Sequence, residues 1–130
     1  MNKYEKQYIL AVTDLDEIFS KYVFKMNFQE SVLDLTKLFN KFDKLEVYFD
    51  VLLDNITDEG IQFIIRELNE SINEIQSYIE TLSSKNNDVT IKRDEIVSFY
   101  NYKETLVRHK TRIERLTARG FPGRKGMATT

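Results

Sequence analysis

The residues best suited to chemistry are four arginines near the C-terminus, whose spacing places them on one stripe of a helix. They recur at intervals of 4, 3 and 4 residues: Arg108, Arg112, Arg115 and Arg119. Lys110, Arg124 and Lys125 add positive charge nearby, and Phe121 adds an aromatic ring. Arginine forks bind phosphate groups, and an aromatic ring can stack on an unpaired base. The pattern therefore predicts a site for an anionic partner, with single- or double-stranded nucleic acid as the favoured ligand.

The charge of the chain is divided between its two ends. Residues 1–90 carry 9 Lys and Arg against 17 Asp and Glu, a net of −8, whereas residues 91–130 carry 10 against 4, a net of +6. One interpretation is a basic binding end. The other is internal pairing, because residues 58–82 hold six acidic residues against Arg66 alone and would lie beside the basic helix in a hairpin. Arg115 and Arg119 would then project past the acidic helix, which leaves both interpretations open.

No other set of residues has the composition of an active site or a metal site. His109 is the only histidine and lies on an apolar seam, and the chain has no cysteine, so ligands for zinc and a catalytic thiol are missing. Carboxylates cluster at residues 14–17 and at Asp50 and Asp54, but they occupy helix positions expected to face solvent and lack EF-hand spacing. No phosphate-binding glycine loop or nucleophile elbow occurs. The sequence predicts a protein that is not an enzyme and uses no cofactor.

The elements that must position these residues are helices with heptad seams. In one segment apolar residues alternate at intervals of 4 and 3: Ile61, Ile65, Leu68, Ile72, Ile75, Ile79 and Leu82. A similar seam runs from Leu35 to Ile56, and a weaker one runs from Phe99 to Leu116 and includes Tyr102 and His109. Such spacing is typical of helices packed as coiled coils or bundles. Only one glycine, Gly60, and no proline interrupts residues 1–119, which favours long helices.

These patterns predict a helical body over residues 1–119 and a flexible basic tail over residues 120–130. The expected helices span about residues 3–25, 29–55, 58–83 and 90–119. Thr57 is the predicted N-cap of the third helix, and Gly120 is placed to end the fourth. Short connections favour antiparallel neighbours. We expect an all-α fold in which long antiparallel hairpins form a four-helix bundle or an extended coiled-coil-like assembly, with self-association through the seams.

Two functional hypotheses follow from the charge pattern. The first is a non-enzymatic binding or assembly protein, such as an accessory of replication, recombination or packaging, whose basic C-terminal end contacts nucleic acid. The alternative is a regulator of another protein, an inhibitor, adaptor or chaperone, that uses its acidic helical face and binds no nucleic acid. No apolar run is long enough to span a membrane, and the N-terminus lacks the apolar core of a signal peptide. The expected location is therefore intracellular, in the cytoplasm.

Overall fold

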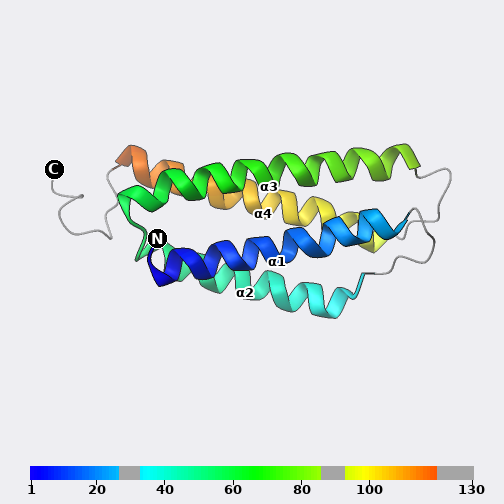
Figure 1. The fold of residues 1–130 in the computed structure, drawn as a ribbon, viewed down its shortest axis with the longest axis horizontal. Coiled ribbons are helices and arrows are strands. Elements are labelled where there is room, and N and C mark those ends of the chain that lie inside the picture. Colours follow the sequence, from blue (N-terminus) through cyan, green and yellow to red (C-terminus); the bar gives the residue numbers. More distant parts are fainter. Residues whose placement is uncertain (27–32, 86–92, 120–130) are drawn as a thin grey trace.

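The protein folds into a bundle of long helices (Figure 1). The structure is a computed structural model that describes residues 1–26, 33–85 and 93–119. Its helices are α1 (Lys3–Met26), α2 (Leu35–Leu53), α3 (Asp58–Lys85) and α4 (Arg93–Arg119). The described residues contain no strand, and the predicted all-α fold is confirmed. α1 and α2 form one antiparallel hairpin, α3 and α4 form the other, and the two hairpins pack as a four-helix bundle.

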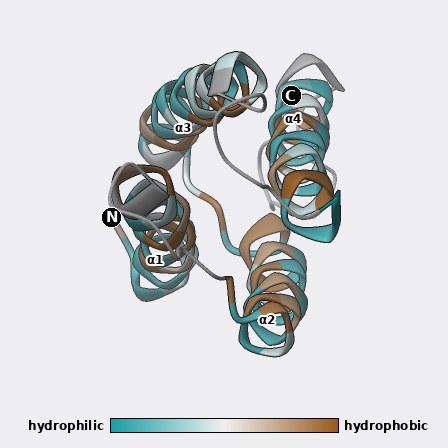
Figure 2. Cartoon of the chain, turned by 90° about the vertical axis from the view of Figure 1, so that its right-hand side faces the viewer, coloured by the Kyte–Doolittle hydropathy of each residue, from teal (hydrophilic) through white to brown (hydrophobic). Residues whose placement is uncertain are grey.

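The order of the helices around the bundle differs from their order in the chain. Viewed along the bundle, α1 lies beside α2 and α3, whereas α4 lies beside α3 and α2 (Figure 2). The neighbours α1 and α3 therefore run in the same direction, as do α2 and α4. As a result, α1 and α4 face each other across the bundle, and residues 54–57 cross between diagonally opposite corners.

The apolar seams form the core, but the buried face of each helix is wider than the seam. In α3, Ile61, Leu68 and Ile75 are buried as the heptad pattern predicts. Ile64, which lies outside the predicted seam, is fully buried, while the seam residues Ile65 and Ile72 are only partly buried. A helix in a four-helix bundle contacts two neighbours and the bundle centre, so a stripe wider than two residues per heptad is removed from water.

Aromatic rings fill the centre of the bundle between the diagonal helices α1 and α4. The ring centroids of Phe19 and Phe99 lie 4.6 Å apart, and those of Phe19 and Tyr102 lie 5.0 Å apart. Phe42 of α2 joins them, with its ring centroid 6.0 Å from that of Tyr102. All but Phe42 are fully buried. Large rings reach across a diagonal that short side chains would leave empty, which explains why these four aromatic residues lie on the apolar faces.

Helix α1 begins with a reciprocal capping arrangement. The Glu5 backbone N–H donates to Asn2 Oδ1 at 2.9 Å, and the Asn2 backbone N–H donates to Glu5 Oε1 at 2.8 Å. Each residue thus satisfies an N–H group that the first helical turn leaves unpaired. The side chain of Asn2 also donates to the carbonyl of Asn55 at 2.7 Å, which fixes the start of α1 to the α2–α3 connection.

Helix α3 begins at Asp58, and Thr57 is confirmed as its N-cap. Thr57 Oγ1 accepts a hydrogen bond from the Gly60 backbone N–H at 3.0 Å. The Thr57 N–H and hydroxyl both donate to Glu5 Oε2 at 2.9 Å, so the buried Glu5 carboxylate joins the starts of α1 and α3. A Cβ atom at Gly60 would lie 1.7 Å from that oxygen. Glycine is therefore required here by the close approach of the carboxylate.

Several expected helix boundaries differ from those in the structure. The expected start of the second helix near residue 29 is wrong, because residues 33 and 34 are not helical and Asp34 caps α2 by accepting from the Lys37 N–H at 3.1 Å. The Leu33 N–H instead donates to the buried Glu95 of α4 at 2.8 Å. The third helix extends to Lys85 rather than 83. The expected helical residues 90–92 and the expected tail, 120–130, lie outside the described residues.

One acidic residue that was expected to face solvent is half-buried between helices. Asp16 accepts a hydrogen bond from Ser71 of α3 at 2.6 Å and another from the Tyr102 hydroxyl of α4 at 2.5 Å. Burial raises the pKa of Asp16, the two hydrogen bonds oppose that effect, and the nearby negative charge of Glu74 adds to it. Asp16 is therefore part of the polar packing of α1 against α3 and α4.

Candidate functional site

The arginine stripe predicted from the sequence lies on α4, and the structure separates its members into two groups. Arg108 is exposed but takes part in an ion pair, whereas Arg112 and Arg115 are exposed and make no ion pair on the described part of the chain. Arg119 is the last residue of α4, and its side chain is not described. Phe121, Arg124 and Lys125 lie outside the described residues.

Arg108 binds α2 and not the acidic helix α3. Its guanidinium donates from Nη2 to Glu46 Oε1 at 2.5 Å and from Nη1 to Glu46 Oε2 at 3.3 Å. Burial alone would raise the pKa of Glu46, but the hydrogen bonds and charge interactions with Arg108 and His109 together outweigh burial and lower the pKa. The charge of Arg108 is thus matched within the fold, as the internal-pairing interpretation required, although by a different helix.

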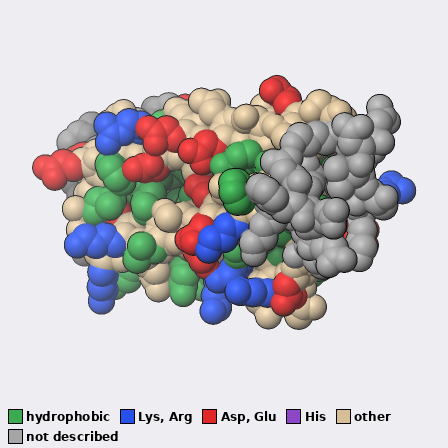
Figure 3. Space-filling view, turned by 45° about the vertical axis from the view of Figure 1, so that its right-hand side comes forward, with side chains coloured by type: hydrophobic (Ala, Val, Ile, Leu, Met, Phe, Trp, Pro, Cys, Tyr) green, Lys and Arg blue, Asp and Glu red, His purple; other side chains and the backbone are tan. Residues whose placement is uncertain are grey.

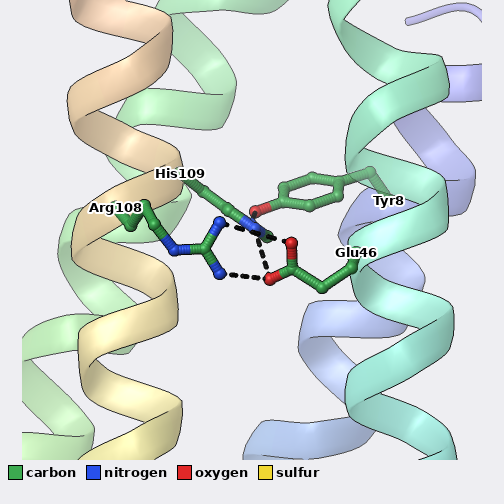
Figure 4. A network of polar contacts seen from close by, with 4 residues as sticks. All are labelled: Tyr8, Glu46, Arg108 and His109. Atoms are coloured by element: carbon green, nitrogen blue, oxygen red, sulfur yellow. Dashed lines mark hydrogen bonds and ion pairs between the residues drawn. The ribbon is translucent and has the colours of Figure 1, made fainter.

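Next to this pair, His109 is fully buried in a polar network that joins three helices (Figure 4). Its Nε2 lies 3.0 Å from Glu46 Oε1, and its Nδ1 lies 2.7 Å from the hydroxyl of Tyr8 on α1. Burial lowers the pKa of His109 to about 4, against the opposing effect of Glu46, so the ring is neutral at pH 7. Because a carboxylate only accepts, Nε2 carries the proton and the Tyr8 hydroxyl donates to Nδ1.

A carboxylate, an imidazole and a phenol in series are groups that can move protons in catalysis. Here, however, the His109 and Tyr8 side chains have no exposed surface, and the His109 ring stacks on Phe49 with 3.7 Å between centroids. Burial also raises the pKa of Tyr8 well above its usual value. A substrate therefore has no access to the imidazole or the phenol, and the network acts as a polar connection between α1, α2 and α4.

The acidic helix lies beside the basic one, as the hairpin arrangement predicted. The described polar contact between them joins Lys103 Nζ to Gln76 Oε1 at 2.6 Å. The carboxylates of Glu59, Glu70 and Glu74 are exposed and make no ion pair within the described ranges. The face of α3 that points away from the bundle is therefore a solvated acidic surface.

A second basic region was missed by the sequence analysis because it lies within residues 1–90, which carry a net negative charge. Lys37, Lys41 and Lys44 recur on α2 at intervals of 4 and 3, the same helical spacing as the arginines of α4. Two lysines of α1, Lys3 and Lys6, line the same groove as Lys41 and Lys44. The signal was present in the spacing, but only the packing of α1 on α2 brings the two sets together.

The chain has no counterpart in the comparisons with known proteins. No family model, curated protein or solved structure matches it. No helix over the described ranges is long and apolar enough to cross a membrane. No group of three or more His, Cys, Asp or Glu side chains in the same ranges is arranged to hold a metal ion.

Proposed function

We propose that this chain is a non-enzymatic helical binding protein whose C-terminal end contacts nucleic acid. The observation that carries the proposal is the exposure of Arg112 and Arg115, which make no ion pair among the described residues. They lie four and seven positions beyond Arg108 on α4, and the sequence continues with Arg119, Arg124 and Lys125. Unpaired guanidinium groups in a row are suited to successive phosphates.

The network around His109 supports this role by fixing the helix that carries the arginines. Arg108 and His109 attach α4 to Glu46 of α2, and Tyr8 attaches the same point to α1. Arg112 and Arg115 follow within the next two turns of α4. Their guanidinium groups are therefore presented from a rigid support, which reduces the entropy lost on binding.

The test is a fluorescence-anisotropy titration of labelled single- and double-stranded oligonucleotides at several salt concentrations. The proteins compared are the full chain, a 1–119 truncation and the variant Arg112→Gln/Arg115→Gln. For a single strand, the plot of log K against log salt should lose about 0.7 in slope for each phosphate contact removed, so about 1.4 for the double variant. Affinity of the full chain that is independent of salt would contradict the proposal.

A second candidate function is favoured by the acidic surface of α3. Glu59, Glu70 and Glu74 are exposed along α3 without ion pairs on the described part of the chain, and such a surface can occupy the basic groove of a protein partner. The chain would then be a regulator that binds no nucleic acid. Replacing Glu70 and Glu74 by Gln should abolish this activity, whereas Arg112→Gln/Arg115→Gln should leave it unchanged.

The sequence also predicts self-association, and the arrangement of the core limits which side chains could take part in it. The side chains of the α3 seam are buried or partly buried within a single chain. Association of copies would therefore use other side chains than those of the heptad seams. Among the exposed apolar residues, Val97, Tyr100 and Val107 lie along the outward face of α4.

A further inference from the structure

A groove of about 850 Å³ lies between α1 and α2, and all of its described lining residues belong to these two helices. Four lysines and two tyrosines are among its lining residues: Lys3, Lys6, Lys41, Lys44, Tyr4 and Tyr48. In Figure 3, most of the Lys and Arg side chains on the visible face gather in its lower half, where α1 and α2 lie, with hydrophobic side chains exposed among them.

The positive charge of the groove is largely unmatched. Among the residues that the structure describes, Asp14 is the one acidic residue that lines it, and Asp14 accepts a hydrogen bond from Lys41. Lys6 and Lys44 are exposed and make no ion pair among the residues described. A smaller adjoining groove of about 400 Å³ shares Lys41 and Lys44 and adds Lys37, together with the acidic Asp34. The α2 lysines therefore follow the groove for about 10 Å, at 1.5 Å of rise per residue.

Aromatic and apolar surface lies between these charges. Tyr4 and Tyr48 are partly exposed in the groove, and Leu10, which also lines it, is 67% exposed. Lys3 Nζ lies 5.0 Å from the centre of the Tyr4 ring. Lysines that follow a groove with aromatic rings between them match a ligand that has a charged backbone and flat unpaired bases. A duplex keeps its bases stacked inside and would leave the rings unused.

We infer that the groove between α1 and α2 binds single-stranded nucleic acid, with phosphates on Lys6 and Lys44 and a base on Tyr4. The inference rests on the proposed function, since the ligand is of the same class, but it uses residues of the opposite hairpin. It also specifies the form of the ligand, because stacking on a tyrosine requires an unpaired base.

The experiment compares oligonucleotide binding by four full-length proteins in fluorescence-anisotropy titrations over a range of salt. These are the wild type, Lys6→Gln/Lys44→Gln in the groove, Arg112→Gln/Arg115→Gln on α4, and the control Lys21→Gln/Arg66→Gln. The control removes the same charge from exposed positions outside both sites. Circular dichroism verifies that each variant is folded. A polyglutamate competitor tests whether the groove accepts an acidic polypeptide equally well.

We expect the groove variant to bind single strands more weakly than the control, with a salt slope lower by about 1.4, and to change duplex binding much less. Tyr4→Leu should weaken single-strand binding roughly 5- to 100-fold, and Tyr4→Phe should restore it, since stacking needs the ring and not the hydroxyl. Tyr4 is suitable for this test because it is not part of the buried core.

The other outcomes separate the inference from the proposed function. Loss of binding only in the α4 variant would overturn the groove assignment and retain the C-terminal site. Loss only in the groove variant would retain the groove and overturn the C-terminal site. Equal affinity for single strands and duplexes, or equally strong competition by polyglutamate, would overturn the inference of a single-strand site. No binding of any oligonucleotide at low salt would overturn both.

Discussion

At the scale of single residues, His109 is a side chain capable of acid–base catalysis that instead stabilises the fold. The same side chain that suggests proton transfer is fully buried, neutral and bound on both ring nitrogens, to Glu46 and Tyr8. A buried polar group of this kind stabilises a fold only while every partner is present, because an orphaned partner retains its desolvation cost. The network therefore makes the packing of α4 on α1 and α2 specific.

The buried imidazole predicts a particular acid sensitivity. Its pKa is about 4 in the folded protein and near 6.5 in the unfolded chain. Between these values the unfolded chain binds the additional proton, so the free energy of unfolding should fall as the pH decreases from 6.5 to 4, by about 3 kcal/mol in total from this group. Urea unfolding at a series of pH values measures this effect.

His109→Gln is the matched control, because the amide retains hydrogen-bonding groups and cannot titrate. This variant should lose the part of the pH dependence that lies between pH 4 and 6.5. Since the chain has one histidine, NMR of the imidazole reads its titration directly. A folded-state pKa above 6.5, or a proton on Nδ1 rather than Nε2, would contradict the described network.

At the scale of elements, the starts of α1 and α3 depend on one carboxylate. Glu5 accepts from the backbone N–H groups of Asn2 and Thr57 and from the Thr57 hydroxyl, while Gly60 leaves the space that the carboxylate occupies. Burial alone would raise the pKa of Glu5, but these hydrogen bonds outweigh it and lower the pKa. Both helix dipoles also favour a negative charge at this point.

This arrangement predicts that the effect of Gly60→Ala changes sign with the residue at position 5. In the wild type, the new methyl group displaces the buried carboxylate from its hydrogen bonds, and we expect a loss of roughly 1–3 kcal/mol in the free energy of unfolding. In a Glu5→Ala background the clash with the carboxylate is absent and only the approach to Thr57 Oγ1, at 3.0 Å, remains. We expect the higher helix propensity of alanine, worth up to about 1 kcal/mol relative to glycine, to outweigh that contact and stabilise the helix. Urea denaturation of the four proteins of this cycle gives both values. Equal effects in the two backgrounds would show that Glu5 and Gly60 do not interact.

At the scale of the whole molecule, the aromatic centre makes the two hairpins one cooperative unit. Phe19 of α1 contacts Phe99 and Tyr102 of α4 across the bundle, and it has no exposed surface. Neither hairpin alone can bury these rings. The hairpins are therefore expected to unfold together.

Phe19→Ala tests this cooperativity. We expect it to lower the free energy of unfolding by about 3–5 kcal/mol, as is usual for a buried phenylalanine. Far-ultraviolet circular dichroism and tyrosine fluorescence should still report one coincident transition. Phe39→Ala on the exposed side of α2 is the control and should change stability little, because Phe39 is 52% exposed. Two separate transitions in the wild type would mean that the hairpins unfold independently.

The helices and their apolar faces follow directly from the order of the amino acids. Intervals of 3 and 4 residues specify which side of each helix is buried, and Thr57 specifies where α3 begins, because these signals act within one or two turns. The spacing of the arginines likewise predicts that they lie on one stripe of α4. Local signals also failed in places, as at the start of α2, where the cap at Asp34 and the hydrogen bond from Leu33 to Glu95 set the boundary.

Which helix faces meet one another depends on the packing of the whole bundle. Similar apolar stripes can pack in more than one order, so the diagonal placement of α1 and α4, and with it the contacts of His109 and Asp16, does not follow from periodicity. The net charges of the two segments did not predict the contacts, for the same reason. The partner of Arg108 is Glu46 on α2. The lysines of the α1–α2 groove lie within residues 1–90, which carry a net negative charge. Salt screens exposed charges beyond about 10 Å, so the effect of a charged side chain depends on its neighbours in space rather than on the net charge of a segment of the chain.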